Sequence, residues 1–515
     1  MAKDYLTEFL PDLEEFRDKT MKFHNKEITV PEYKGFSGGF GSYAQRGGDK
    51  HMLRLRMAGG RIDKEKLRFI VESCDKYHVD RLKLTTCQSM QIHNLEAEDL
   101  CSLIEEAWKA GMISRGGGGD FPRNVMASPL SGVQKEDYFD VQPYAQAAGE
   151  YLMGFIKAVR FPRKLKVGFS SSPVNDTHVT FRDLGFAANK NRTFDVYAAG
   201  GLGNNPKLGV CVAKEIEPEK ILYYIKAMVN AFVEYGNYEN RAKARTRYMQ
   251  DTLGADGFVK AYQDKLSEVI KTEKLDIVPE AYEVKKQGNG KGISGKRIIP
   301  QKQEGLYAVF YQPVGGNIEP AVVKELYKAV KDMDEVELRL TPQEGMYIIN
   351  CNADEAEKLL ELTKDSAQTV FETSVACIGN TVCQVGLGDS QGLLKSCVEA
   401  VRRENFADGV LPRIYISGCP SSCGTHQIAA LGFRGAMKQT PDGPKPAFAI
   451  FEGGNALQGS EVLSETGKGM TITVADIPKF LVELGKTVAA DNTTYDEWIK
   501  TNHNVLEELV TKYTA

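Results

Sequence analysis

Two stretches of this chain share one pattern: HMLRLRMAGGRIDKEKLRFIVESCDKYHVDRLKLTTCQSMQIHN at residues 51–94 and YAVFYQPVGGNIEPAVVKELYKAVKDMDEVELRLTPQEGMYIIN at residues 307–350. An offset of 256 residues, which places 51 on 307, aligns the two stretches without a gap. Apolar residues recur at i, i+3, i+4 and i+7 in both copies, which predicts a helix with one buried face. Each copy predicts the same order of elements: a strand, a helix, two strands and a second helix. The chain is therefore expected to contain a duplicated α+β unit.

The duplication is expected to extend beyond these stretches. We align FPRKLKVGFSSSP at 161–173 with LPRIYISGCPSSC at 411–423, at an offset of 250 residues, which places Lys164 and Lys166 opposite Ile414 and Ile416. The two related halves then span about 48–283 and 304–490, and a Gly- and Lys-rich linker joins them. The linker fits the start of a phosphate-binding loop, but Arg297 stands where such a loop needs Ser or Thr for magnesium.

Four cysteines have ligand-like spacing. They form C-x5-C and C-x3-C pairs, at Cys377, Cys383, Cys419 and Cys423. Four thiolates suit an iron–sulfur cube, in which each iron takes one thiolate. Three alternatives remain open at this point: a zinc site, for which x5 is an unusual spacing, disulfides, which need an oxidising compartment, and four unrelated packing thiols.

Composition excludes some classes of protein. The chain has 515 residues, with 65 basic against 69 acidic residues and a net charge of −4, so a general nucleic-acid binder is not expected. The charged N-terminal stretch predicts no secretory signal, and no apolar stretch is long enough to cross a bilayer. Ten cysteines in such a chain indicate a reducing, cytoplasmic location.

The two halves carry different chemistry. The second half supplies the four cysteines, whereas the first supplies cations in the corresponding segments, namely Arg54, Arg123, Lys164 and Lys166. A cluster of Arg and Lys side chains attracts a small anion and can donate hydrogen bonds and protons to it. The alternative is a solvated basic strand, which is the usual fate of a Lys pair. The position opposite the cysteine loop favours the anion site.

With these motifs the chain resembles the sirohaem-containing nitrite and sulfite reductases, from roughly residue 30 to residue 490. The resemblance implies an internally duplicated α+β fold, in which two ferredoxin-like half-domains and two larger α+β domains are related by pseudo-two-fold symmetry. The implied segments are 48–113 and 304–372 for the half-domains, 114–283 for the first sirohaem-binding domain, 284–303 for the linker, 373–490 for the cysteine-bearing domain and 491–515 for a C-terminal helical tail.

The resemblance also implies the cofactors and their ligands. It implies sirohaem and a [4Fe–4S] cluster, with all four cysteines on the cluster and Cys423 shared between the cluster and the sirohaem iron. Arg54, Arg123, Lys164 and Lys166 match the family's anion-binding residues. Thr85, Gln91, Arg163 and Arg245 are placed near the sirohaem edge.

The implied reaction is the six-electron reduction of sulfite to sulfide, with electrons passing from the cluster through Cys423 to sirohaem. The Lys164-x-Lys166 pair resembles sulfite-reducing members, whereas nitrite-reducing relatives tend to have Asn at the second position, so reduction of nitrite to ammonium is the alternative. The electron donor is expected to be ferredoxin or a separate reductase subunit, and neither nucleic acid nor membrane is expected as a partner. The competing classes are a non-catalytic iron–sulfur electron carrier and a zinc-stabilised binding protein.

Two positions depart from the family pattern. Cys87 stands where a T-[TN]-R-Q run usually has Arg, and Ser421 stands in CPSSC where relatives often have Asn. Since Cys cannot pair with a carboxylate as Arg does, we expect sirohaem affinity or potential to differ unless Lys83 or Arg115 compensates. A reactive thiol at Cys87 is the other interpretation.

Overall fold

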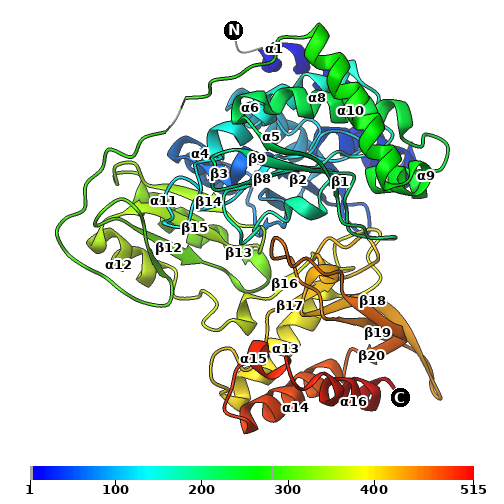
Figure 1. The fold of residues 1–515 in the computed structure, drawn as a ribbon, viewed down its shortest axis with the longest axis vertical. Coiled ribbons are helices and arrows are strands. Elements are labelled where there is room, and N and C mark those ends of the chain that lie inside the picture. The colour runs from blue at the N-terminus through cyan, green and yellow to red at the C-terminus, as the bar shows by residue number, and fades with distance from the viewer. Residues whose placement is uncertain (1–3, 281) are drawn as a thin grey trace. The chain divides into compact units, whose positions relative to one another are not determined.

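The computed structural model describes residues 4–280 and 282–515, and the chain forms two compact units. Unit 1 contains the chain up to Gly201 together with Lys207–Tyr311 and Asn317–Lys364; unit 2 contains Leu202–Pro206, Gln312–Gly316 and Asp365–Ala515. Both mix helices and strands, which confirms the α+β class (Figure 1).

The two repeated stretches fold alike, element by element. The first copy gives β1 (Ser42–Ala44), β2 (His51–Leu55), β3 (Arg61–Ile62), α4 (Lys64–Lys76), β4 (Leu82–Leu84), β5 (Met90–Leu95) and α5 (Ala97–Lys109). The second gives β11 (Ile298–Pro300), β12 (Tyr307–Tyr311), β13 (Asn317–Ile318), α11 (Pro320–Val330), β14 (Glu337–Leu340), β15 (Met346–Cys351) and α12 (Ala353–Leu362). Gly59 and Gly315 occupy the same left-handed turn, with φ of 60° and 66°, where an L side chain would be strained. The predicted duplication at an offset of 256 residues is confirmed.

Each half-domain donates a strand to the other. The first five-stranded sheet runs β1-β2-β5-β4-β13, and the second runs β11-β12-β15-β14-β3. Strand β13 therefore completes the first sheet, where Asn317 pairs with Lys83, and β3 completes the second, where Arg61 pairs with Arg339. Neither sheet is complete without the other half of the repeat.

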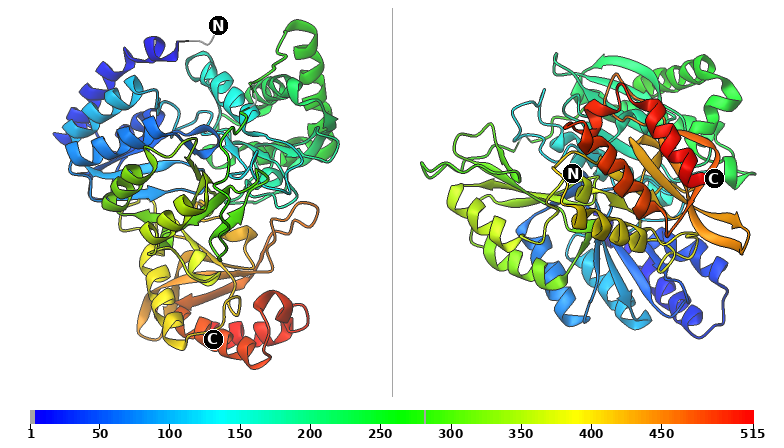
Figure 2. Two further views of the ribbon diagram at one scale, coloured as in Figure 1. Left: turned by 90° about the vertical axis from the view of Figure 1, so that its left-hand side faces the viewer. Right: turned by 90° about the horizontal axis from the view of Figure 1, so that it is seen from below.

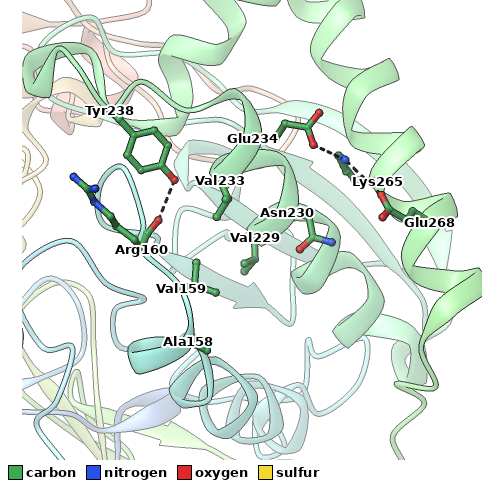
Figure 3. A pocket seen from close by; sticks show the side chains of 10 residues that line it. All are labelled: Ala158, Val159, Arg160, Val229, Asn230, Val233, Glu234, Tyr238, Lys265 and Glu268. Carbon is green, nitrogen blue, oxygen red and sulfur yellow. Dashed lines mark hydrogen bonds and ion pairs between the residues drawn. The ribbon is translucent and has the colours of Figure 1, made fainter.

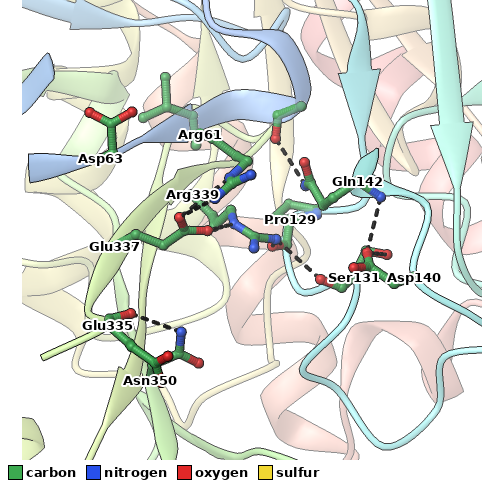
Figure 4. A network of polar contacts seen from close by, with 12 residues as sticks. Arg61, Asp63, Pro129, Ser131, Asp140, Gln142, Glu335, Glu337, Arg339 and Asn350 are labelled. Atoms are coloured by element: carbon green, nitrogen blue, oxygen red, sulfur yellow. Dashed lines mark hydrogen bonds and ion pairs between the residues drawn. The ribbon is translucent and has the colours of Figure 1, made fainter. Parts of the chain in front are cut away.

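A buried network of charged side chains reinforces one of these exchanges (Figure 4). Arg61 Nη2 on β3 donates to Glu337 Oε2 on β14 at 2.7 Å, and Arg339 Nε donates to the other carboxylate oxygen. Arg339 Nη1 also donates to the carbonyls of Pro129 at 3.2 Å and Ser131 at 3.1 Å. Burial raises the pKa of Glu337, but the two arginines outweigh this effect and the pKa is lowered. The pair is thus held in its charged form.

One hydrophobic core underlies both half-domain sheets. Helices α4 and α11 pack against each other (Figure 1). Their apolar stripes contribute buried residues such as Leu67, Ile70 and Leu326 to one core. The N-terminal helices α1 (Tyr5–Phe9), α2 (Asp12–His24) and α3 (Val30–Ser37) add Phe9 and Phe16 to this core. Each such side chain contributes about 1.5–3 kcal/mol when it is fully buried.

Unit 1 also contains a third sheet with its own core. Its order is β10-β9-β8-β7-β6, from β6 (Met126–Ala127), β7 (Val167–Ser170), β8 (Leu184–Ala188), β9 (Phe194–Ala198) and β10 (Val210–Ile216). The remaining helices of the unit are α6 (Gln142–Met153), α7 (Phe155–Ala158), α8 (Ile221–Tyr235), α9 (Met249–Leu253) and α10 (Ala255–Thr272). Strands β6, β7 and β8 are parallel, so their carboxyl ends lie at one edge of the sheet.

Unit 2 repeats this sheet. Its order is β16-β17-β18-β19-β20, from β16 (Val375–Ala376), β17 (Ile414–Ser417), β18 (Leu431–Thr440), β19 (Gly443–Glu452) and β20 (Glu465–Thr473). The helices are α13 (Ser390–Glu404), α14 (Ile477–Ala490), α15 (Tyr495–Trp498) and α16 (His503–Thr514). Helices α14 and α16, drawn in red, pack together in both views (Figure 2).

The strand registers correct the alignment of the second repeat. Val167 pairs with Leu184 in unit 1, and Ile414 pairs with Leu431 in unit 2, so 167 corresponds to 414 and the offset is 247 rather than 250. The sequence alignment placed Lys164 and Lys166 opposite Ile414 and Ile416, and this correspondence is wrong. The alignment was wrong because both segments contain a Pro-Arg pair and small residues, which match better three residues out of register than in the register of the strands.

The corrected register shows what replaces the cysteines in the first half. Cys377 N donates to the Ile416 carbonyl at 3.1 Å, and Ser128 N donates to the Phe169 carbonyl at 3.1 Å, so Ser128 corresponds to Cys377. By the same register, Ser172 corresponds to Cys419. The first half thus has hydroxyl groups at two of the positions where the second half has thiols.

Candidate functional site

Two of the predicted anion-binding residues share one backbone carbonyl in unit 1. Arg54, on β2, donates from Nη1 to the Gly117 carbonyl at 2.9 Å, and Arg123 Nη1 donates to the same oxygen at 2.5 Å. Arg123 Nη2 also donates to the Gly119 carbonyl at 2.7 Å. The glycine-rich segment before Arg123 thus serves as the carbonyl platform on which both guanidinium groups are oriented.

Tyr43 is a neighbour of this pair that sequence reasoning missed. Its hydroxyl accepts a hydrogen bond from Gly119 N at 2.9 Å. Burial raises the pKa of Tyr43, but the charges of Arg123 and Arg54 outweigh burial and the pKa is lowered. Burial lowers the pKa of Arg123 itself to about 10, so the guanidinium remains charged at neutral pH.

The two predicted lysines lie immediately before β7. Leu165, between them, is fully buried, whereas Lys164 and Lys166 are half-buried, so in an extended segment both side chains lie on the same side. Lys166 N donates to Asp183 Oδ2 at 2.8 Å, which fixes the backbone at this point. Lys166 Nζ donates to Cys87 Sγ at 3.4 Å.

Cys87 therefore lies among the positively charged side chains of Arg54, Arg123, Lys166 and Arg182, which are called the cation cluster below. Burial raises the pKa of its thiol, but the charges of Lys166, Arg182 and Arg54 outweigh burial and lower the pKa to about 6. Of the two compensating residues that we considered, Lys83 is bound to Glu344 at 2.8 Å in a fully buried ion pair. Arg115 donates to the Gly39 carbonyl at 2.8 Å. The guanidinium groups whose charges act on Cys87 belong instead to Arg182 and Arg54.

Asp183 binds Lys166 of the cation cluster, and it also binds Arg245. This fully buried carboxylate accepts from Arg245 Nη2 at 3.0 and 2.9 Å, from the Thr246 hydroxyl and from Lys166 N. Arg182 and Asp183 follow a short helical turn, Val179–Phe181, that precedes β8. Their sequence, TFRDLG, gave no signal because a single Arg-Asp pair is usually exposed and solvated.

The other residues expected near the sirohaem edge have defined partners. Thr85 Oγ1 accepts from Ser89 N at 3.2 Å and from Cys87 N at 3.4 Å, which shapes the turn that carries Cys87. When the Gln91 amide is oriented to satisfy its neighbours, its oxygen accepts from Arg54 Nη2 at 2.6 Å. Arg163 Nη1 donates to Asp120 Oδ1 at 2.5 Å. Thr85 thus shapes the turn of Cys87, and Gln91 binds Arg54 of the cation cluster. Arg163 is instead bound to Asp120.

The cluster fits a cofactor that carries many carboxylates. Arg123 Nε, Arg182 Nη2 and Arg245 Nε are buried guanidinium nitrogens that have no hydrogen-bond partner among the described residues. A buried donor without a partner costs about 1–3 kcal/mol, so three such donors on neighbouring side chains indicate an anionic group that they bind. The carboxylate-rich edge of sirohaem would satisfy them.

The four predicted cluster cysteines lie on two loops of unit 2. Cys377 follows β16 directly and Cys419 follows β17 by two residues, and these strands are parallel neighbours. Gly418 N donates to Cys377 Sγ at 3.1 Å, and both Leu387 N and Gly388 N donate to the Gly418 carbonyl. The loop that carries Cys377 and Cys383 is therefore bound to the start of the loop that carries Cys419 and Cys423.

The second loop turns sharply to present its thiols. Ser422 has a φ of 53°, in the left-handed region, and Ser417 Oγ accepts from Gly424 N at 3.0 Å. His426 Nδ1 lies 2.9 Å from the same hydroxyl, so this histidine supports the loop. Cys423 is exposed, while Cys377, Cys383 and Cys419 are half-buried.

This arrangement fits a cluster rather than a single ion. Within residues 4–280 and 282–515 no three His, Cys, Asp or Glu side chains converge as ligands of one metal ion. A zinc ion requires four ligand atoms about 2–2.3 Å from one centre, whereas a four-iron cube takes one thiolate at each iron and spreads its ligands apart. The two joined loops carry the four thiols on two segments that are bonded to each other.

A surface hollow of unit 1 lies apart from these residues (Figure 3). Its volume is about 740 Å³, and α8 and α10 contribute Val229, Glu234 and Lys265 to its lining. The Tyr238 hydroxyl donates to the Arg160 carbonyl at 2.9 Å at one side of it. None of the cation-cluster residues lines this hollow.

Comparisons with known proteins agree with this description. The model described as nitrite/sulfite reductase ferredoxin-like half domain matches residues 43–109 and 299–366, and the model described as nitrite and sulphite reductase 4Fe-4S domain matches residues 118–270. The chain is 27% identical over 441 residues to ferredoxin–nitrite reductase of Betula pendula, covering 82% of this chain and 74% of that protein. It is 24% identical over 436 residues to the NADPH sulfite reductase hemoprotein beta-component of Oceanobacillus iheyensis, covering 75% and 72%.

A solved structure supports the fold. The NirA protein of Mycobacterium tuberculosis superposes with a TM-score of 0.77 at 20% sequence identity, over 95% of this chain and 94% of that one. Taken together, the matches define an oxidoreductase of the iron–sulfur class. The chain belongs to the nitrite and sulfite reductase family, whose cofactors are sirohaem and a [4Fe–4S] cluster. Among the described residues, no helix combines the length and apolar character that a membrane crossing requires.

Proposed function

We propose that this chain reduces sulfite to sulfide, with the anion bound by the cation cluster of unit 1. The observation that carries this proposal is that Arg54 and Arg123 share the Gly117 carbonyl, while the charges of Arg54 and Lys166 both act on the Cys87 thiol. Such preorganised donors bind anion oxygens without reorganising when charge develops on them. Sulfite can carry two negative charges near neutral pH and gains from each additional cation.

The residues of the chain have distinct roles in this proposal. Sirohaem and the cluster, when bound, would pass electrons from the donor to the anion. Cys377, Cys383, Cys419 and Cys423 would hold the cluster. Arg54 and Arg123 orient the anion through their guanidinium N–H groups, while the ammonium groups of Lys164 and Lys166 donate protons to oxygens that leave as water.

Nitrite reduction to ammonium is the second candidate. The contact of Lys166 Nζ with Cys87 Sγ favours it, because a cation that already has an anionic neighbour adds less to the binding of a dianion. We also propose ferredoxin as the electron donor, since several relatives are ferredoxin–nitrite reductases. A separate reductase subunit is the alternative donor, since one relative is named as the hemoprotein beta-component of an NADPH sulfite reductase.

The test compares kcat/KM for sulfite and for nitrite on cofactor-loaded protein with a reduced viologen donor, counting sulfide and ammonium. We expect Lys166→Ala to retain the visible spectrum and to lose on the order of 10²–10³-fold in turnover, as expected when one preorganised donor is removed. Lys190→Ala, at an exposed lysine of the β8–β9 connection, is the matched control. Full activity of Lys166→Ala with intact cofactors would contradict the assigned role.

A further inference from the structure

Cys87 is held firmly at the centre of the cation cluster. Asn124 Nδ2 donates to the Cys87 carbonyl at 3.0 Å, and Asn124 Oδ1 accepts from Met57 N at 2.9 Å. Thr85 Oγ1 accepts from Cys87 N on the other side of the turn. The backbone of Cys87 is therefore held on both sides of the residue.

Four cations from four different segments surround this thiol. Lys166 precedes β7 and contacts Sγ at 3.4 Å, Arg182 precedes β8, Arg54 lies on β2 and Arg123 precedes β6. The charges of Lys166, Arg182 and Arg54 outweigh burial and lower the thiol pKa to about 6, so the thiolate predominates at neutral pH. Burial instead raises the pKa of Cys74, in helix α4 of the same half-domain, to about 12. The environment of Cys87 therefore differs from that of a packing cysteine.

A second observation shows that this is a binding region and not an isolated cysteine. Arg182 is 6% exposed, and its Nη2 has no hydrogen-bond partner among the described residues, although its charge acts on Cys87. The cluster thus has donor capacity left for an incoming anion beside the thiol. An anion that enters here meets Lys166, Arg182 and the Cys87 sulfur together.

We propose that Cys87 is a specificity-determining residue, whose thiolate is a fixed counter-charge to Lys166 and lowers the preference of the site for a dianion over a monoanion. This inference rests on the proposed function and names what sets the balance between its two candidate substrates. The repulsion between a fixed negative charge and a dianion is twice that with a monoanion at the same distance. Sulfite is therefore penalised more than nitrite while the thiolate is present.

The pH dependence follows from the ionisation of the thiol. Above a pKa of about 6 Cys87 is anionic and the penalty on the dianion is present; below it the thiol is neutral and the penalty disappears. Sulfite itself gains a proton in acid and is then a monoanion like nitrite, so the penalty on the dianion also disappears with the protonation of the substrate. The comparison of variant and wild type at the higher pH, where the dianion is present, therefore carries the test, and the state of the thiol is followed separately by its own titration.

The primary experiment measures kcat/KM for sulfite and nitrite in wild type, Cys87→Ala and the control Cys74→Ala, as cofactor-loaded enzymes. At about pH 8 we expect Cys87→Ala to raise the sulfite-to-nitrite ratio on the order of tenfold, which corresponds to one pKa unit of coupling. At about pH 5, below the thiol pKa, the ratio of the variant should approach that of the wild type. An unchanged ratio at the higher pH, or an equal change at both, would overturn the proposal.

A second readout needs no turnover. The ultraviolet absorbance of the thiolate, taken as wild type minus Cys87→Ala, should titrate with a midpoint near 6, and Lys166→Met should move that midpoint upward. A midpoint at the ordinary thiol value in both backgrounds would overturn the ion pair. If neither anion is reduced, the proposed function fails while this titration still decides the state of Cys87. Cys87→Ser, which keeps the size and loses the charge, replaces Cys87→Ala if that variant does not take up sirohaem.

Discussion

Replacing Glu337 by Ala should destabilise unit 1 strongly, because it leaves two arginines without their shared carboxylate. Arg339 is 4% exposed at its side chain and Arg61 is 28% exposed, so Arg339 carries most of the penalty. Removing one partner of a buried ion pair costs about 3–5 kcal/mol, and the two carbonyls that accept from Arg339 Nη1 offset only part of this. We therefore expect a loss of about 3 kcal/mol in the free energy of unfolding.

The chain offers a clean probe for this measurement. It has two tryptophans, and Trp108, in unit 1, is fully buried, while Trp498 belongs to unit 2. In a Trp498→Phe background, urea unfolding followed by Trp108 fluorescence reports unit 1 alone. The matched control is Glu325→Ala, whose exposed pair with Lys328 should contribute less than about 1 kcal/mol.

The pH dependence gives an independent check. The pKa of Glu337 is lowered below its ordinary value of 4.5, so its stabilisation is fully present above that value and is lost as pH falls through the lowered pKa. The stability difference between wild type and Glu337→Gln should be constant near neutral pH and shrink only in acid below about 4.5. A Glu337→Ala loss no larger than that of the control, or a difference that shrinks near neutral pH, would refute this account.

Three further predictions follow from the contacts of the site. Asp183→Asn should weaken the hold on Arg245 and reduce the sirohaem bound per chain, measured by absorbance, with far-ultraviolet circular dichroism unchanged; full sirohaem content would contradict it. Cys383→Ser should lose cluster iron by elemental analysis, and an unchanged iron content would remove this residue from the ligand set. Lys83→Met should cost about 3–5 kcal/mol by stranding Glu344, and adding Glu344→Leu should restore most of it; a double variant as unstable as the single one would count against the ion pair.

Much of the fold was accessible from the sequence because the duplication is visible in it. The gap-free match at an offset of 256 residues carries helix periodicity, turn glycines and strand patterns together, and these local signals agree in both copies. The exchange of β3 and β13 was not predicted. Two-residue strands have no periodicity to detect, and their partners are set by the tertiary packing of the half-domains.

The candidate site was predicted less completely. Arg54, Arg123 and Lys166 were named from motifs, and the structure brings them together. Arg182 and Asp183 were missed because nothing in a sequence tells a buried Arg-Asp pair from a solvated one. The three-residue error in the second repeat had a similar cause, since small residues and a repeated Pro-Arg pair do not fix register, whereas backbone hydrogen bonds do.

The strand exchange has a consequence for the folding of the chain during its synthesis on the ribosome. The sheet that begins with Ser42 cannot be completed until Asn317 and Ile318 have been synthesised, long after the rest of that sheet. During that interval the nascent chain carries β4 with one unpaired edge, the kind of edge that other strands can join. We expect the first sheet to be completed only after the second half-domain has emerged from the ribosome, and the exposed edge of β4 to need chaperone protection until then.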